Sequence, residues 1–369
     1  MPSPDVTPGA PRELPVSVRS GRTDRRAVLA VTGADAGLGR ALLERLADAP
    51  HPAAVVGLGA GPGRRTDVDW RPAGVRDPDL VEQLAGVDTV VHLEVDWDVT
   101  GSAALRRDLT VRGTARLLDA ARRAGVARVV LTTSTDVYGS APRVLLDADP
   151  LTGAADDHAL VGDHVEVERL AAHAARSGVA VTVLRPATLV GGRLGPAYDG
   201  PLLRQLGGPR LLAVRGVEPQ WQLCHVDDLL GALELAATGV VTGGRAVACA
   251  GAMPQSIVEA IAGRRRLELP ASVALSTAER LRRAGVTTSS PRELDHLLGP
   301  LVVTCDGLRD AGWLPAWTNE TALRAHLAER GGDARAAGVA AAGATAAGAT
   351  AALIGTAALV RRARRRRGR

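Results

Sequence analysis

The sequence predicts an α/β fold with a doubly wound parallel sheet and a smaller, mixed C-terminal lobe. Two observations predict it. From residue 27 onward, short apolar β-branched runs alternate with Ala-, Leu- and Arg-rich segments of helical period. Apolar strands separated by helices of this length are typical of right-handed crossovers and of a sheet covered on both faces. Beyond residue 191 the alternation becomes irregular, and Gly/Pro turns separate shorter segments.

The elements are expected in the following order along the chain. Strands are expected at 27–31, 53–56, 89–93, 128–133 and 179–184. The helices between them are expected at 38–47, 79–84, 103–124 and 163–176. The C-terminal lobe is expected to contain a strand at 245–249 and helices near 227–237 and 276–284. This alternation is that of a Rossmann fold.

Composition divides the chain into four regions. Residues 1–26 mix five Pro with scattered charge and no apolar stretch, so a disordered leader is expected. Residues 27–190 are expected to form the Rossmann domain, and 191–330 a substrate-binding lobe interleaved with it. Residues 331–369 are an Ala/Gly-rich segment and an Arg-rich tail.

The tail leaves two alternatives open. Residues 336–360 are uncharged over 25 positions, which is long enough to span a bilayer, and seven Arg follow that anionic lipids would attract. Ala, Gly and Thr dominate the stretch, however, and a flexible Ala-rich tail is the favoured interpretation. The expected location is cytoplasmic, with membrane association through 336–369 as the alternative.

Missing residue types exclude several chemistries. All 45 cations of the Lys+Arg count are Arg, so a phosphate-loop NTPase, a pyridoxal Schiff base and a lysine-assisted tyrosine are excluded. The formal charge of +5 resides in the tail, because the last nine residues hold seven Arg and leave −2 for residues 1–360. No nucleic-acid interface on the folded part is indicated. The three cysteines lack metal-ligand spacing, and no metal site is expected.

The clearest motif is a glycine-rich turn after the first strand. Gly33, Gly37 and Gly39 lie between that strand and an Ala/Leu helix. Glycines there permit a tight turn, and the helix N-terminus attracts a pyrophosphate. We therefore expect a dinucleotide site, although an ordinary strand-to-helix turn would read the same.

The end of the second strand bears on the choice of cofactor. No carboxylate that could hold a ribose 2′-hydroxyl follows this strand, and Arg64 and Arg65 come next. Paired arginines suit a 2′-phosphate, which favours NADP over NAD. A solvated Arg pair in a glycine-rich loop is the alternative.

With these residues the chain resembles the extended short-chain dehydrogenase/reductases, the NAD-dependent epimerase/dehydratase family that acts on nucleotide sugars. The likeness runs from about residue 27 to 327. It rests on six stretches in order: VTGADAGLGRALLERL, VDTVVHLE, TVRGTARLLDAARRAGVARVVLTTSTDVYG, VTVLRPATLVGG, QLCHVDDLLGALELA and AGWLPAWTNETAL.

The resemblance implies roles for individual positions. It implies that the pyrophosphate is lined by Gly33, Gly37, Leu38 and Gly39. It implies that Val75 contacts the adenine and that Leu93 contacts the adjacent ribose. Around the nicotinamide, it implies that Thr110 forms the wall behind the ring and that Arg185, Pro186 and Val190 lie beside it. Ser134 matches the active-site Ser/Thr of the family. Two positions depart from the pattern, because Ala36 and Gly74 stand where a glycine and an acidic residue are usual.

The catalytic pair of the family is missing. Its Tyr-x-x-x-Lys motif aligns with Leu160 and His164, and no register supplies the pair, since the chain has no Lys and no Tyr between Tyr138 and Tyr198. His164, with its neighbours His158 and Asp163, is a candidate substitute, and Tyr138 is favoured as a packing residue. A leucine cannot donate a proton, so turnover by the family mechanism is doubtful.

Two further groups of polar residues have alternative interpretations. A structural role is favoured over a metal for His225, Asp227 and Asp228, and solvation over substrate contact for Glu94, Asp96 and Asp98. Two functions stay open: a sugar-nucleotide epimerase, dehydratase or reductase with an altered proton donor, and a non-catalytic dinucleotide-binding or redox-sensing protein. A nucleotide sugar is the expected partner, and a homodimer is left open.

Overall fold

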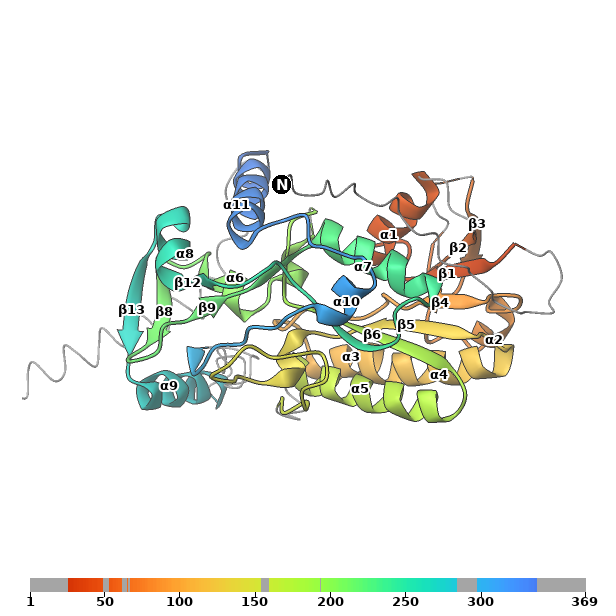
Figure 1. Cartoon of the computed structure of the whole chain (residues 1–369), viewed down its shortest axis with the longest axis horizontal. Coiled ribbons are helices and arrows are strands. Elements are labelled where there is room, and N and C mark those ends of the chain that lie inside the picture. Colours follow the sequence, from red (N-terminus) through yellow and green to blue (C-terminus); the bar gives the residue numbers. More distant parts are fainter. Residues whose placement is uncertain are drawn as a thin grey trace, which may run out of the picture.

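A seven-stranded parallel sheet organises the chain (Figure 1). The computed structural model describes residues 26–48, 53–61, 65, 67–153, 159–192, 194–283 and 297–336. The strand order is β11-β6-β5-β4-β1-β2-β3, and every pair is parallel. The strands are β1 (Val28–Thr32), β2 (Ala54–Gly59), β3 (Asp69–Pro72), β4 (Thr89–Val91), β5 (Arg128–Thr132), β6 (Ala180–Pro186) and β11 (Gly243–Val247). This confirms the predicted doubly wound α/β fold.

Helices cover both faces of the sheet (Figure 1). Neighbouring strand residues face opposite ways, so Val31 packs on the side of α1 and α7 while Ala30 packs on the side of α2, α4 and α5. Two apolar layers result, which is why the strands read as continuous apolar runs. The first layer contains α1 (Gly37–Asp48) and α7 (Val226–Thr238), and the second contains α2 (Leu80–Gln83), α4 (Gly113–Ala124) and α5 (Leu160–Arg176).

The long helix expected at 103–124 is interrupted. It begins as α3 (Ala103–Arg107), passes through a π-helical turn η1 (Asp108–Arg112) and continues as α4. Such turns insert one residue per turn and are frequent at functional sites. Here the turn contains Thr110, whose hydroxyl accepts the backbone N–H of Asp96 at 3.1 Å. No periodicity in the sequence marks this insertion.

The C-terminal lobe lies at the opposite end of the molecule from β3 (Figure 1). It is interleaved with the sheet domain, because α7 and β11 lie between its segments in sequence and return to the sheet. Its helices are α6 (Pro201–Gln205), α8 (Gln255–Ala262), α9 (Ala271–Arg283) and α11 (Asn319–Ala336). Its strands pair as β7 (Thr188–Val190) with β10 (Leu223–His225), β8 (Arg210–Val214) with β13 (Arg265–Leu269), and β9 (Gln220–Trp221) with β12 (Met253–Pro254). Short helical turns η2 (Thr135–Tyr138), η3 (Pro196–Tyr198) and α10 (Asp306–Asp310) connect the parts.

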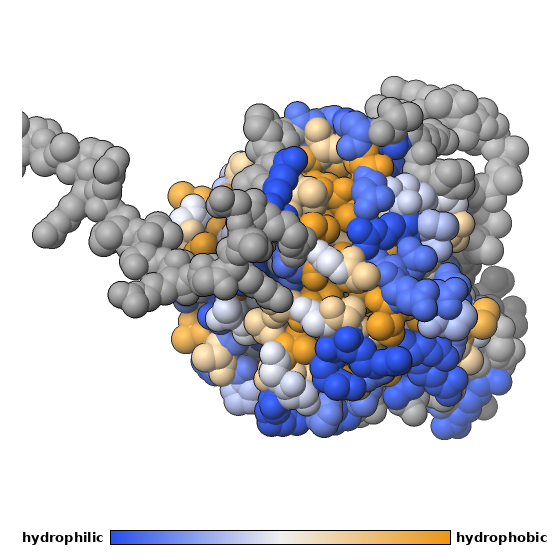
Figure 2. Space-filling view, turned by 90° about the vertical axis from the view of Figure 1, so that its right-hand side faces the viewer, coloured by the Kyte–Doolittle hydropathy of each residue, from blue (hydrophilic) through white to orange (hydrophobic). Residues whose placement is uncertain are grey.

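The end of the molecule remote from the lobe is mixed in character. Figure 2 shows hydrophobic residues across the middle of this face, with hydrophilic ones around them. Within the described ranges, no helix combines the length and the apolar character needed to cross a bilayer. The expected leader, except Arg26, and residues 337–369 of the tail lie outside the described residues.

Candidate active site

The glycine turn lies at the carboxyl end of β1, where the strand order reverses between β1 and β4. Ligands of doubly wound sheets bind at such a switch point. Gly33 and Gly37 have φ of +63° and +50°, which L side chains rarely adopt. A Cβ on Gly39 would lie 2.2 Å from the carbonyl oxygen of Gly33, so only glycine lets α1 start this close to the strand. The backbone therefore forms a tight strand-to-helix turn that only glycines allow.

A tyrosine from the lobe side occupies this turn. The backbone N–H of Leu38 donates to the hydroxyl oxygen of Tyr198 at 3.2 Å. The same oxygen lies 2.0 Å from where a Cβ on Gly37 would stand. Tyr198 belongs to η3, and its ring stacks with that of Trp97 at a centroid distance of 6.1 Å. The helix N-terminal donor expected to face a pyrophosphate is thus satisfied by the chain itself.

The adenine end shows a similar self-contact. Val75 is buried, and its backbone N–H donates to the carboxylate of Glu94 at 3.0 Å. Burial raises the pKa of this carboxyl. Glu94 reaches the position because Gly74, which precedes Val75, leaves room: a Cβ there would lie 3.0 Å from the Glu94 carboxylate. Glu94 is therefore not simply solvated, and it lies where the acidic residue missing at position 74 was expected.

Arg65 lies away from the turn. Its guanidinium pairs with Asp67 at 2.7 Å and with Asp48 at 2.5 Å. Asp48 is the last residue of α1, whereas the turn precedes its first, and 12 helical residues span about 18 Å. Arg65 therefore does not reach the cofactor crevice as the sequence suggested. Arg64 lies outside the described residues.

Buried polar contacts support the strand ends behind the turn. The Thr32 hydroxyl contacts His92 Nδ1 at 2.8 Å and accepts the backbone N–H of Leu93 at 3.0 Å. His92 Nε2 contacts Thr114, whose hydroxyl donates to the carbonyl of Thr110. Leu93 and Thr110 are both buried. These contacts join β1, β4 and the π-helical turn, so the expected nicotinamide wall is rigid.

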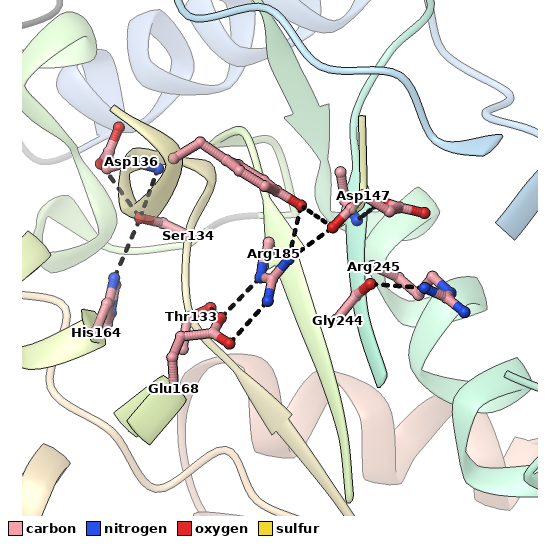
Figure 3. A network of polar contacts seen from close by, with 11 residues as sticks. Thr133, Ser134, Asp136, Asp147, His164, Glu168, Arg185, Gly244 and Arg245 are labelled. Carbon is pink, nitrogen blue, oxygen red and sulfur yellow. Dashed lines mark hydrogen bonds and ion pairs between the residues drawn. The ribbon is translucent and has the colours of Figure 1, made fainter. Parts of the chain in front are cut away.

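Ser134 is the central polar residue beyond β5. Figure 3 shows its hydroxyl between Asp136 and His164. His164 Nδ1 lies 3.1 Å from Ser134 Oγ, which donates to the Asp136 carboxylate at 3.3 Å. Ser134 also caps η2 by accepting the backbone N–H of Asp136 at 3.2 Å. The structure thus brings together the two residues that the sequence selected as catalytic candidates.

The remaining candidates around α5 take structural positions. Leu160 begins α5 and faces the cavity described below, one turn before His164. Asp163 points elsewhere and pairs with Arg106 at 2.8 Å. His158 lies outside the described residues. An aliphatic side chain therefore forms this part of the cavity wall.

His164 cannot replace the lysine electrostatically. It is 1% exposed, and burial, together with the nearby Arg106, lowers the pKa of its imidazole to about 3. The ring is therefore neutral near pH 7. It can hold Ser134 by a hydrogen bond, but it supplies no positive charge to a neighbouring phenol or ribose.

We expect acid to destabilise the protein through such histidines. Burial lowers the pKa of His92 and His164 to about 3 and that of His326 to about 4. Below pH 6.5 these histidines bind protons in the unfolded chain but not in the folded state. The free energy of unfolding therefore falls as pH falls, by up to about 1.4 kcal/mol per pH unit for each histidine.

Urea unfolding at pH 7 and pH 5 measures this loss. His164→Gln should reduce the pH dependence. His173→Gln, an exposed position on the same helix, should leave it unchanged. If all three proteins lost the same unfolding free energy between pH 7 and pH 5, the assignment of His164 as buried and neutral would be contradicted.

Two other groups serve structure. Tyr138 is buried, accepts from Arg185 at 2.7 Å and donates to the carbonyl of Asp147 at 3.2 Å, and Arg185 pairs with Glu168 (Figure 3). The Asp228 carboxylate accepts two backbone N–H groups at positions 316 and 317. His225 stacks on Trp317 at 3.8 Å. No cluster of metal-ligating side chains occurs within the described ranges.

A cavity of about 390 Å³ opens beside Ser134. It lies between the sheet end and the lobe, and its wall includes Pro186 on β6 and Leu189 on β7. Tyr198 lines it as well, so this ring stands between the cavity and the glycine turn. A cavity of this size suits a small-molecule ligand.

Sequence reasoning did not identify Trp97, Asp136 or the role of Tyr198. Asp136 is accessible within the cavity but surrounded by protein, and the surrounding protein raises the pKa of its carboxyl. Its position two residues after Ser134 was the available signal. Trp97 follows β4 at the ligand-binding edge, but nothing local indicates that it contacts Tyr198.

Comparisons with known proteins agree with this geometry. Residues 29–249 match the model of the NAD dependent epimerase/dehydratase family. An uncharacterized protein of Mycobacterium tuberculosis is 31% identical over 321 residues, 82% of this chain and 84% of that one. The 3-diazoavenalumate denitrifying reductase of a Streptomyces species is 38% identical over 142 residues, 37% of this chain and 45% of its own. MoeE5, solved with UDP-glucuronic acid and NAD, superposes with a TM-score of 0.63 at 21% identity, over 83% of this chain and 99% of its own.

Proposed function

Because this chain belongs to the NAD dependent epimerase/dehydratase family, we propose that it binds a nicotinamide dinucleotide along the glycine turn and a small molecule in the cavity, without proton transfer by a Tyr–Lys pair. The observation that carries this is the glycine turn at the switch point of the sheet. Gly33, Gly37 and Gly39 each occupy a position that a side chain would strain or block. Glycines in this arrangement let the backbone of a strand-to-helix turn approach a pyrophosphate.

A dinucleotide along the glycine turn would require Tyr198 to move. Leu38 N–H would then face the pyrophosphate, and Pro186 and Ser134 border the cavity end where a nicotinamide would lie. A bound nicotinamide supplies hydride exchange. The chain's own part is to orient the ligands and to exclude water with Trp97 and Leu160, which both line the cavity.

We propose NAD rather than NADP as the preferred cofactor. Arg65, on which NADP was favoured, pairs with Asp67 and Asp48 instead. At the end of β2, the Asp35 carboxylate lies 3.0 Å from where a Cβ on Gly59 would stand. A carboxylate there suits a ribose 2′-hydroxyl and repels a 2′-phosphate.

The proton-transfer groups support a second, catalytic candidate. Asp136 faces the cavity with a raised pKa and contacts Ser134 at 3.3 Å. A carboxyl group beside a hydroxyl at the cavity wall is an acid–base pair placed to exchange a proton with a substrate oxygen. This favours a slow reductase or epimerase with an altered donor. Asp136→Asn should then abolish NADH-dependent reduction of an aromatic aldehyde while NADH binding persists.

NADH binding tests the main proposal. Calorimetric titration should give saturable binding with Kd below about 1 mM, and turnover of UDP-glucose should be absent or about 10²–10⁴ below that of a Tyr–Lys enzyme. The proposal would be refuted if neither NADH nor NADPH bound saturably to the natural protein or to the variant described next.

Tyr198→Phe should tighten NADH binding. The change frees Leu38 N–H from its present acceptor, and a net hydrogen bond contributes about 0.5–1.5 kcal/mol, which corresponds to roughly two- to tenfold in Kd. Tyr138→Phe is the matched control, because that hydroxyl is buried outside the cavity. If both variants bind NADH alike, Tyr198 does not compete for the turn.

A further inference from the structure

The cavity beside Ser134 has a largely apolar wall. Aliphatic and aromatic side chains from the sheet end and the lobe surround it. Trp97 and Tyr198 form one aromatic side, with ring planes inclined by 28°. Such rings offer flat apolar surface to a ligand. The aliphatic members include Val99, Leu160, Leu189, Leu202, Leu298 and Leu301.

The described wall contains no cation. Asp136 and Tyr198 are its only ionisable side chains, and neither can carry positive charge. Pro186 and Pro201 also lack a backbone N–H that an anion could use. Diphosphates in proteins are held by Arg, Lys or converging N–H groups, and an unpaired buried charge is costly. A nucleoside diphosphate would therefore meet one carboxyl group and no counter-charge in this wall.

The polar side chains of the described wall are mostly hydroxyls. Ser134 and Asp136 contact each other at the sheet end of the cavity, and Thr135, Ser140, Thr152 and Thr188 also line it. His164 supports Ser134 from behind without lining the cavity. Uncharged hydroxyls of this kind suit a hydroxyl or carbonyl oxygen on a mainly apolar molecule.

We propose that the cavity binds an uncharged, mainly apolar small molecule carrying a hydroxyl or carbonyl group that contacts Ser134, and not a nucleotide sugar. The inference deepens the proposed function, because it names the substrate class of the same site. The wall of this chain carries the argument by itself.

Binding of matched probes tests the inference. Calorimetry compares 2-naphthol, 2-naphthyl phosphate and UDP-glucose on the full-length protein, with and without NADH. The two naphthyl probes share one ring system and differ by the phosphate group. We expect 2-naphthol to bind at least about tenfold more tightly than either phosphate compound. Tighter binding of UDP-glucose or of 2-naphthyl phosphate would overturn the inference.

Two variants place the probe in the cavity. Leu298 lines the cavity and is 38% exposed, so Leu298→Asp should fold and should weaken 2-naphthol binding at least about fivefold by burying a carboxylate against the ring. Leu314→Asp, at a position 68% exposed and outside the lining, should leave the affinity unchanged. Equal affinities in the two variants would show that the probe binds elsewhere and would overturn the inference.

The same samples separate this inference from the proposed function. Binding of 2-naphthol without any binding of NADH would refute the dinucleotide proposal and leave the cavity assignment supported. Binding of NADH together with preferential binding of UDP-glucose would support the dinucleotide proposal and refute the cavity assignment.

Discussion

Asp163→Ala is expected to lower the free energy of unfolding by about 3–5 kcal/mol. The carboxylate is fully buried and pairs with Arg106, which is 1% exposed, at 2.8 Å, and with Arg107 at 3.0 Å. Removing it leaves the Arg106 guanidinium charged and buried with its main partner gone.

Urea unfolding measures this loss at pH 7. Asp119→Ala provides the control, because Asp119 pairs with Arg122 on the surface of α4, where both side chains are 54% exposed. Such pairs contribute about 0–1 kcal/mol. A loss below about 1 kcal/mol in Asp163→Ala would mean that water or another acceptor replaces the carboxylate.

Gly39→Ala is expected to weaken dinucleotide binding. The added methyl would lie 2.2 Å from the Gly33 carbonyl oxygen and 2.8 Å from that of Thr32, and both are backbone atoms that cannot rotate away. The turn must shift, and overpacking of this kind costs about 1–3 kcal/mol of stability. Since the N–H groups of the turn move with it, NADH affinity should fall at least about tenfold.

Gly231→Ala is the matched control for this prediction. Gly231 lies within α7, where the nearest atoms to an added Cβ are side-chain atoms at 3.7 Å or more. Alanine should be tolerated there and should stabilise the helix by up to about 1 kcal/mol. NADH binding by Gly39→Ala at the natural affinity would show that the turn does not hold the pyrophosphate.

The sheet was predictable because its signals are local. Each strand of the Rossmann domain needs apolar side chains on both faces, and β1, β4, β5 and β6 show this as short continuous runs. The edge strand β3 was not expected, because Asp69–Pro72 carries no such run and is held by pairing with β2 alone. The π-helical turn was not predicted either, because one extra residue leaves the helical period of the sequence nearly unchanged.

The candidate site was predictable only as far as its backbone. The glycines at 33, 37 and 39 indicate a turn that residues with side chains cannot form, and Ser134 comes two residues after the end of its strand. The position of Arg65 could not be inferred, because its guanidinium pairs with Asp48 at the far end of α1. Whether a charged side chain faces a ligand or a neighbouring carboxylate depends on tertiary contacts that no local pattern encodes.

The sequence by itself determined the parallel sheet, the phosphate-type turn and the absence of a Tyr–Lys pair. Each of these depends on the residue types at particular positions, which the sequence gives directly. Only the tertiary structure decided that Tyr198 accepts from Leu38 and that Glu94 accepts from Val75. It also decided that the cavity wall in the described part of the chain lacks a cation. These contacts join segments up to 160 residues apart, and their formation follows from how the lobe packs on the sheet.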